Sequence, residues 1–140
     1  MEVKHLSGDF FLVTLKYTKQ LNNGELKRVS ENFLVQTYTF GSAETNSFEY
    51  LNKKGVFGDI NVTAIKRENY NQVILNGSET FFKMTVTYLS TEDKKIKATF
   101  IVEAEKIEEA NSILTEYLKD ENYQAFEIVN ASLSSIKGVF

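Results

Sequence analysis

The feature that most constrains this chain is an internal duplication. The run Phe10–Tyr17 recurs as Phe81–Tyr88, identical at four of eight positions and replaced by a similar apolar residue at two more. The run Phe33–Thr37 recurs as Phe100–Ala104. The offset is 71 residues for the first pair and 67 for the second. Because the offset drifts only where loops fall, we interpret the chain as two copies of one structural unit.

Each copy has the patterns of a hairpin, a helix and a further strand. Apolar residues alternate over Phe11–Tyr17, which is typical of a half-buried strand. Asn22-Asn23-Gly24 then predicts a tight turn, because Asn and Gly tolerate positive φ. A second strand is expected over about 27–37. The closing strands are expected over about 59–66 and 125–133.

A helix is predicted in each copy between the hairpin and the last strand. The first should run from Gly41 or Ser42, as the cap, to about Lys53, with Gly55 ending it. In the second copy, apolar residues recur at helical spacing from Ile107 to Leu118.

These elements predict an α+β fold. We expect a single domain over residues 1–140, built of two tandem β-β-α-β repeats at about 10–74 and 81–140 with pseudo-twofold symmetry. The favoured arrangement is one antiparallel-rich sheet with both helices packed on one face. The alternative is two smaller sheets packed together.

Composition argues against most catalytic chemistry. The chain of 140 residues has no Cys and a single His, which excludes thiolate sites and Cys nucleophiles and disfavours His-based triads and zinc sites. The carboxylates Glu103, Glu105, Glu108 and Glu109 lack the Asp-rich, glycine-hinged spacing of a cation loop. We therefore expect a protein that is not an enzyme and has no cofactor, no metal and no catalytic residue.

Charge and hydropathy restrict the environment and the partners. The net charge of −3 divides into +1 over residues 1–74 and −4 over 75–140, so neither half carries a general nucleic-acid footprint. No apolar run is long enough to span a membrane, and residues 1–12 lack a basic segment followed by an apolar one, so we expect no secretion signal. We expect a cytoplasmic protein that does not bind membranes.

The duplication supplies an internal control, because polar residues found in one copy only are freer to serve function. The clearest difference is the segment 66–71, which the second copy replaces with Ser132–Lys137. Its candidate ligand-binding residues are Lys66, Arg67, Asn69, Tyr70 and Asn71. Arg67 could grip phosphate or carboxylate, and Tyr70 could stack on a ring. The alternative is a solvated connection in which Tyr70 packs as Ile136 does in the other copy.

A second basic cluster could extend this candidate site. Lys27 and Arg28 lie on the second predicted strand, and Lys53 and Lys54 lie at the predicted helix end. Together with segment 66–71 they could form one basic patch. For Lys53 and Lys54, favourable interaction with the helix dipole is the simpler explanation.

The sequence resembles a small family of domains of unknown function found in Bacteroidetes and in phages that infect them. The resemblance covers nearly the whole chain from about Phe10 to Val139-Phe140. Its most recognisable element is Ile65-Lys66-Arg67 with Asn69-Tyr70. The resemblance implies a fold and a bacterial or phage origin, and it implies no activity.

The leading functional hypothesis is a non-enzymatic small binding protein that engages an anionic, nucleotide-like ligand or inhibits a host protein. A phage sponge for a nucleotide immune signal, or an inhibitor docking onto a host enzyme, would fit. The alternative is a nucleic-acid-binding accessory protein of phage DNA metabolism. A homodimer is expected in either case, because strands at a sheet edge without Pro can pair edge to edge.

Overall fold

The computed structural model describes residues 3–56 and 58–140. They form nine strands and two helices. In chain order, these are β1 (Lys4–Leu6), β2 (Phe10–Gln20), β3 (Leu26–Gln36), α1 (Phe40–Lys53), β4 (Asn61–Glu68), β5 (Gln72–Leu75), β6 (Phe81–Leu89), β7 (Lys95–Glu103), α2 (Ile107–Asp120), β8 (Gln124–Leu133) and β9 (Ile136–Val139).

The elements fall into two compact units, each built from separated parts of the chain. The α1 unit consists of Gly8–Glu68 and Ser135–Phe140. The α2 unit consists of Asn69–Ser134 together with residues 3–7. Each unit therefore depends on a short strand from a distant part of the sequence, β9 in the α1 unit and β1 in the α2 unit.

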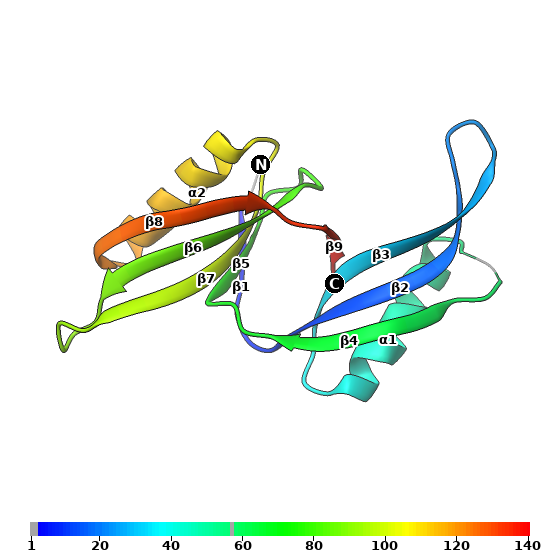
Figure 1. The fold of residues 1–140 in the computed structure, drawn as a ribbon, viewed down its shortest axis with the longest axis horizontal. Coiled ribbons are helices and arrows are strands. Elements are labelled where there is room, and N and C mark those ends of the chain that lie inside the picture. Colours follow the sequence, from blue (N-terminus) through cyan, green and yellow to red (C-terminus); the bar gives the residue numbers. More distant parts are fainter. Residues whose placement is uncertain (1–2, 57) are drawn as a thin grey trace. The chain divides into compact units, whose positions relative to one another are not determined.

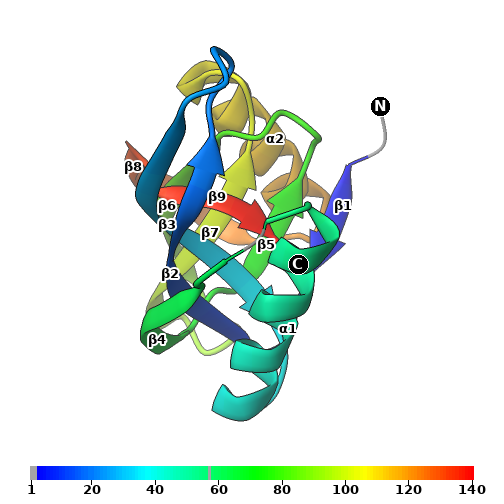
Figure 2. The same ribbon diagram turned by 90° about the vertical axis from the view of Figure 1, so that its right-hand side faces the viewer.

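The α1 unit has a four-stranded sheet with the order β4-β2-β3-β9. β2 pairs antiparallel with both β3 and β4, and β9 runs parallel to β3. Helix α1 packs along one face of this sheet (Figures 1 and 2). The alternating residues of β2 face the helix, as the period of two predicted. The buried core consists of Phe11, Val13, Leu15, Tyr17, Phe33, Val35, Ala43 and Leu51.

The α2 unit has a five-stranded sheet with the order β1-β5-β7-β6-β8. Its central hairpin β6–β7 is antiparallel, and β5 runs parallel to β7. Helix α2 contributes Ala110, Leu114 and Leu118 to a buried core. These three residues lie at i, i+4 and i+8. The apolar residues that recur at helical spacing in the sequence therefore form the buried face of α2.

Helix α1 begins one residue earlier than expected, and its cap is a different residue. Gly41 and Ser42 were predicted as the cap, but the N-cap is Thr39, whose Oγ1 accepts the Ser42 backbone N–H at 3.0 Å. A Thr hydroxyl can satisfy an unpaired N–H of the first turn and Gly cannot. At the other end Gly55 has a φ of +81° and follows the C-cap Lys54, which confirms the predicted stop.

The α+β class is confirmed, and the strands form two mixed sheets. The favoured single sheet with both helices on one face is not what forms, because each helix covers a face of its own sheet. The predicted order of strand, strand, helix and strand occurs in each unit.

The compact units do not coincide with the sequence repeats. Residues 69–74 fall in the predicted first repeat, yet they lie in the α2 unit, where β5 pairs with β7. Residues 135–140 fall in the second repeat and lie in the α1 unit, where β9 pairs with β3. The fourth strand beside each central hairpin thus comes from the end of the other repeat.

Candidate functional site

Two of the predicted site residues, Lys66 and Arg67, lie on β4 rather than after it. Arg67 pairs with Phe11 and Lys66 pairs with Leu12 across β2. Because neighbouring residues of a strand point to opposite faces, Arg67 shares the α1 side of the sheet with Phe11, and Lys66 lies on the other side. The two cations therefore do not point at one ligand. Lys66 instead makes an ion pair with Glu68, Nζ to Oε1 at 3.5 Å.

Arg67 is held in place by an aromatic ring beneath it. Its Cζ lies 4.7 Å from the ring centroid of Phe11 and 6.0 Å from that of Phe40. Its Nη2 donates to the Tyr38 carbonyl oxygen at 3.4 Å, and its Nη1 lies 3.9 Å from Oδ2 of Asp9. The side chain remains 46% exposed. A guanidinium stacked this way is oriented while the rest of its edge stays accessible to an anion.

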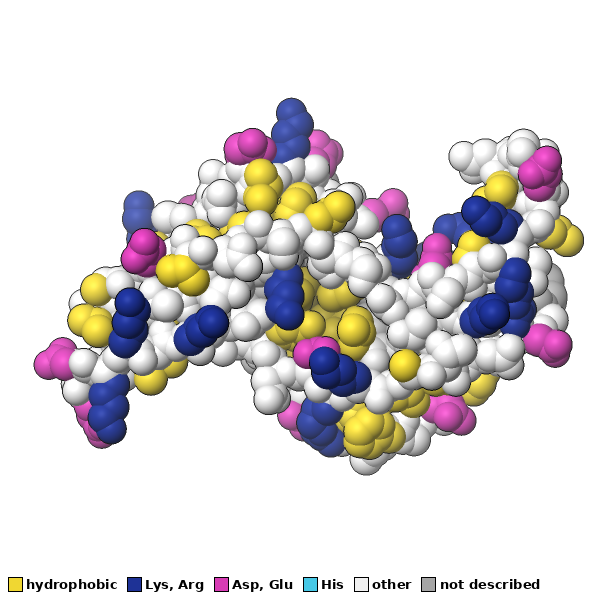
Figure 3. Space-filling view, in the orientation of Figure 1, with side chains coloured by type: hydrophobic (Ala, Val, Ile, Leu, Met, Phe, Trp, Pro, Cys, Tyr) yellow, Lys and Arg dark blue, Asp and Glu magenta, His cyan; other side chains and the backbone are white. Residues whose placement is uncertain are grey.

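Two exposed aromatic residues adjoin this guanidinium, Phe40 through its ring and Tyr38 through its backbone carbonyl. Tyr38 is 78% exposed and Phe40 is 51% exposed, although aromatic side chains usually bury much of their area. Phe40 packs edge-on against Phe11, with ring centroids 4.8 Å apart. We call Tyr38, Phe40 and Arg67 the aromatic–arginine surface. Over the start of α1, hydrophobic side chains reach the surface beside Lys or Arg side chains (Figure 3).

The α2 unit has a different surface at the corresponding place. At the offset of 67 residues, Tyr38 and Phe40 correspond to Glu105 and Ile107. The first turn of α2 carries Glu108 and Glu109, whereas the first turn of α1 carries no acidic residue. Carboxylates at a helix N-terminus complement the positive end of its dipole and repel an anion. Only the α1 unit therefore presents aromatic rings and a cation at this position.

Sequence reasoning missed Tyr38 and Phe40. The sequence does contain a signal for them. At the offset of 67 residues, Tyr38 and Phe40 stand where the second half of the chain has the charged Glu105 and the aliphatic Ile107. Tyr38 and Phe40 lie before the predicted start of the helix, outside the segment 66–71 in which the candidate site was predicted.

The remaining residues of segment 66–71 do not join Arg67. Asn69, Tyr70 and Asn71 belong to the α2 unit, whereas Lys66 and Arg67 belong to the α1 unit. The Asn71 backbone N–H donates to the Thr99 carbonyl at 2.8 Å, which continues the pairing of β5 beside β7. Segment 66–71 therefore ends one strand and leads into another, and its five candidate residues do not form one site within either unit.

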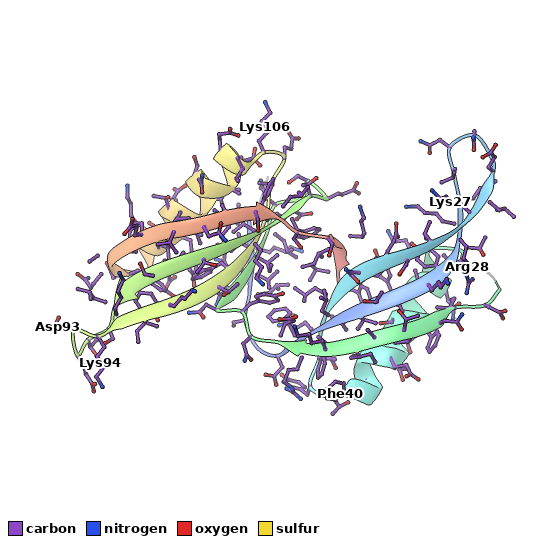
Figure 4. The ribbon with its side chains drawn as sticks, in the orientation of Figure 1. Lys27, Arg28, Phe40, Asp93, Lys94 and Lys106 are labelled. Atoms are coloured by element: carbon purple, nitrogen blue, oxygen red, sulfur yellow. The ribbon has the colours of Figure 1, made fainter. Side chains whose placement is uncertain are left out.

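The structure does not bring Lys27 and Arg28 together with Arg67. Arg28 pairs with Thr18 and Arg67 with Phe11, seven residues apart along β2, or about 23 Å. Figure 4 shows Lys27 and Arg28 near the tip of the β2–β3 hairpin and Phe40 at the start of α1. Arg28 also has a structural role, because its Nη1 donates to the Asp59 carbonyl at 2.7 Å.

The carboxylate cluster of the second copy fixes a loop. The Glu103 side chain is nearly buried, and its Oε1 accepts the backbone N–H groups of Asn76 and Gly77, both at 2.7 Å. Its Oε2 accepts the Glu79 N–H at 2.8 Å. Glu109 Oε1 accepts from Asn76 Nδ2 at 3.1 Å. Among residues 3–56 and 58–140, no group of three or more His, Cys, Asp or Glu side chains is placed to hold a metal ion.

None of the helices in the described part of the chain is long and apolar enough to cross a membrane.

Comparisons with known proteins place the chain in a family. Neither the curated proteins nor the solved structures contain a match to this sequence. A family described as a domain of unknown function, DUF4494, matches residues 9–140 and so spans both units. The chain therefore belongs to the DUF4494 family.

Proposed function

We propose that this chain is a non-enzymatic binding protein whose aromatic–arginine surface engages a nucleotide unit. The observation that carries the proposal is the exposure of Tyr38 and Phe40 beside an oriented, half-exposed Arg67 in one unit only. Surface aromatic residues with a cation beside them are suited to a ligand that joins a planar ring to an anionic group.

The chemistry of the three side chains fits this ligand class. A guanidinium presents its N–H groups in a planar fork that matches two phosphate oxygens. Exposed aromatic rings stack on nucleobases with little dependence on base identity. The first turn of α1 lacks acidic residues and so adds no repulsion to an anion. A free nucleotide and a single strand share this chemistry, and the test below separates them.

The non-enzymatic part of the proposal rests on the composition. A chain with no Cys and one His offers few nucleophiles and few acid–base groups that work near neutral pH. We further propose a cytoplasmic accessory protein of Bacteroidetes or of their phages, on the resemblance described above. In that setting a sponge for a nucleotide immune signal is the specific role that a stoichiometric binder would serve.

The first test is titration of the purified chain with ATP and, separately, with a dT15 oligonucleotide. Binding is measured by isothermal titration calorimetry or by fluorescence anisotropy. Arg67→Lys should weaken binding of the probe by about tenfold, because Lys keeps the charge and loses the planar fork. Tyr38→Ser should weaken it as well, and its exposed ring makes no contribution to the core. Arg28→Lys is the matched control, and it should leave binding unchanged.

The two probes distinguish the two forms of the ligand. Binding of ATP with weak salt dependence indicates a free nucleotide, whereas binding of dT15 that falls steeply with salt indicates a single strand. Arg67→Lys and Tyr38→Ser variants that bind as the wild type does would refute the site. If neither probe binds, and protein purified gently from its producing cell shows no added nucleotide mass by native mass spectrometry, the proposed function is wrong.

Asp9 provides a test in which the substitution should strengthen binding of the probe instead of weakening it. Its Oδ2 lies 3.9 Å from Nη1 of Arg67, and both side chains are about half exposed. The carboxylate therefore competes with an anionic ligand for the guanidinium. Asp9→Asn removes the competing charge while keeping the shape of the side chain, so it should tighten binding of the probe. Weaker binding by this variant would show that Arg67 does not contact the anion.

A further inference from the structure

The five-stranded sheet of the α2 unit is covered by a helix on one face only. Phe82, Met84 and Val86 of β6 belong to the core that α2 completes. Because side chains alternate along a strand, the residues between them, and those beside them on β7, point away from α2. They are Lys83, Thr85 and Thr87 on β6 and Lys95, Lys97 and Thr99 on β7, and we call these six residues the basic face.

The three lysines of the basic face are exposed and unpaired. Within the described part of the chain, none of them makes an ion pair with a carboxylate. Figure 3 looks onto this side of the sheet and shows Lys or Arg side chains standing over its strands. The corresponding face of the α1 unit differs, because its Arg28 donates to the Asp59 carbonyl and its Lys66 pairs with Glu68. The lysines of the α2 unit are therefore available to an anion from outside.

The net negative charge of this half of the chain lies mostly on the other side of the sheet. Helix α2 covers the opposite face and carries Glu108, Glu109, Glu116 and Asp120 against Lys119. On the side of the basic face, Glu103 is engaged by the N–H groups of the loop before β6. Glu127 of β8 lies across Thr87 from Lys97. The charge of −4 over residues 75–140 therefore conceals a face of the opposite sign.

The spacing and chemistry of the basic face suit a row of phosphate groups. Lys95 and Lys97 lie about 7 Å apart along β7, and Lys83 lies about 13 Å along β6 from the residue opposite Lys97. Phosphates of one duplex strand advance about 3.4 Å each along the helix axis, so the three lysines span several of them. The threonine hydroxyls between the lysines, with Asn130 and Ser132 of β8 beside them, are groups that donate to phosphate oxygens.

The basic face lacks the side chains that hold unpaired bases. Proteins that bind single strands stack the bases on aromatic rings, and none of the six residues is aromatic. A duplex keeps its bases paired inside and its phosphates outside, so contacts from lysines and hydroxyls are sufficient. Duplex phosphates also recur along the strand and can meet all three lysines at once, unlike scattered carboxylates of a protein surface. The occupant that fits best is therefore a nucleic-acid duplex.

We propose that the basic face binds the phosphate backbone of a nucleic-acid duplex without reading its base sequence. This surface is separate from the aromatic–arginine surface, which lies in the α1 unit and is proposed to engage a single nucleotide unit. Three phosphate contacts give a slope of about −2.7 for the logarithm of the binding constant against the logarithm of the salt concentration. The binding is therefore measurable at low salt and is lost as salt rises.

Fluorescence anisotropy with a labelled, blunt-ended DNA duplex of about 20 base pairs tests the proposal. The double variant Lys83→Gln with Lys97→Gln should weaken binding by about tenfold or more at about 50 mM salt, and should reduce the magnitude of the salt slope by about 1.8. Lys106→Gln with Lys119→Gln is the matched control. It removes two exposed lysines at the ends of α2 in the same unit, so it should leave the salt slope unchanged.

Three outcomes would overturn the proposal. The first is no binding of the duplex at about 50 mM salt with protein up to about 100 μM. The second is an equal salt slope for the Lys83 and Lys97 double variant and its control. The third is binding of poly-glutamate without binding of the duplex, which would identify an acidic protein partner. Arg67→Lys should bind the duplex as the wild type does, and the double variant should bind ATP as the wild type does, so each proposal can fail alone.

Discussion

Replacing Glu103 should destabilise the α2 unit in a graded way, because one nearly buried carboxylate organises the loop between β5 and β6. Its two oxygens accept three backbone N–H groups at 2.7–2.8 Å, from Asn76, Gly77 and Glu79. Glu103→Ala removes all three acceptors. Glu103→Gln keeps one oxygen, which can still serve Asn76 and Gly77. It places an NH₂ group opposite the Glu79 N–H, so two donors face each other.

The expected magnitude follows from the three bonds. Hydrogen bonds to a charged group contribute about 1.5–3 kcal/mol each, which sets an upper bound of roughly 9 kcal/mol for the set. Gly77 and Glu79 are exposed, so water reaches two of the freed N–H groups. We therefore expect Glu103→Ala to lower the free energy of unfolding by about 3 kcal/mol, and Glu103→Gln by about half of that.

Urea unfolding followed by far-ultraviolet circular dichroism measures these losses, since the chain has no Trp to report by fluorescence. The midpoint should fall in the order wild type, Glu103→Gln, Glu103→Ala, with an unchanged slope. Glu105→Gln is the matched control, because Glu105 is an exposed carboxylate two residues along the chain. Variants of Glu103 within about 0.5 kcal/mol of the wild type would refute the reasoning, because that is the effect of an ordinary surface substitution.

Further predictions concern the helices and the chain's last residue. Thr39→Ala removes the cap of α1 and should cost about 1 kcal/mol in urea unfolding, while Thr39→Ser should restore most of it. Phe140→Ala removes a ring stacked on Tyr50, with centroids 4.0 Å apart, and should cost about 2 kcal/mol because the site is part-exposed; a Phe140→Leu variant equally unstable would exclude a specific role for the ring stack. Burial, with contributions from Tyr123 and Glu121, raises the pKa of Tyr117 to about 12. Because the neutral phenol is favoured in the folded state, this stability is complete below the unfolded pKa near 10 and is lost as pH rises towards 12. Burial also raises the pKa of Tyr17. Absorbance titration at high pH should therefore show late-titrating tyrosines, of which the one near pH 12 is lost in Tyr117→Phe.

Local patterns predicted much of the secondary structure from particular residues. The alternation in Phe11–Tyr17 predicted the buried face of β2, because side chains of a strand alternate between faces. The helical spacing of Ala110, Leu114 and Leu118 predicted the buried stripe of α2. The turn at Asn22-Asn23-Gly24 and the stop at Gly55 followed from positive φ, which both glycines adopt. Each of these properties is decided within about a dozen residues of the chain.

The candidate site was predicted only in part. Arg67 was singled out because it differs between the copies, and it is the cation that the structure places on an aromatic ring. Its predicted companions Asn69, Tyr70 and Asn71 lie in the other unit, and Lys27 and Arg28 lie at the far end of the sheet. Adjacency in sequence was a poor guide here, because the chain leaves one unit at Glu68 and enters the other at Asn69.

The sequence by itself determined that this chain is an α+β protein of hairpins and helices, because the periods of its apolar residues are local. Only the tertiary structure decided that the strands form two sheets, that β5 and β9 complete the sheet of the opposite repeat, and that Arg67 lies over the rings of Phe11 and Phe40. The physical reason is that strand pairing is made between backbone groups, which every residue carries. Side-chain pattern therefore specifies which face of a strand is buried, and much less strongly which strand lies beside it.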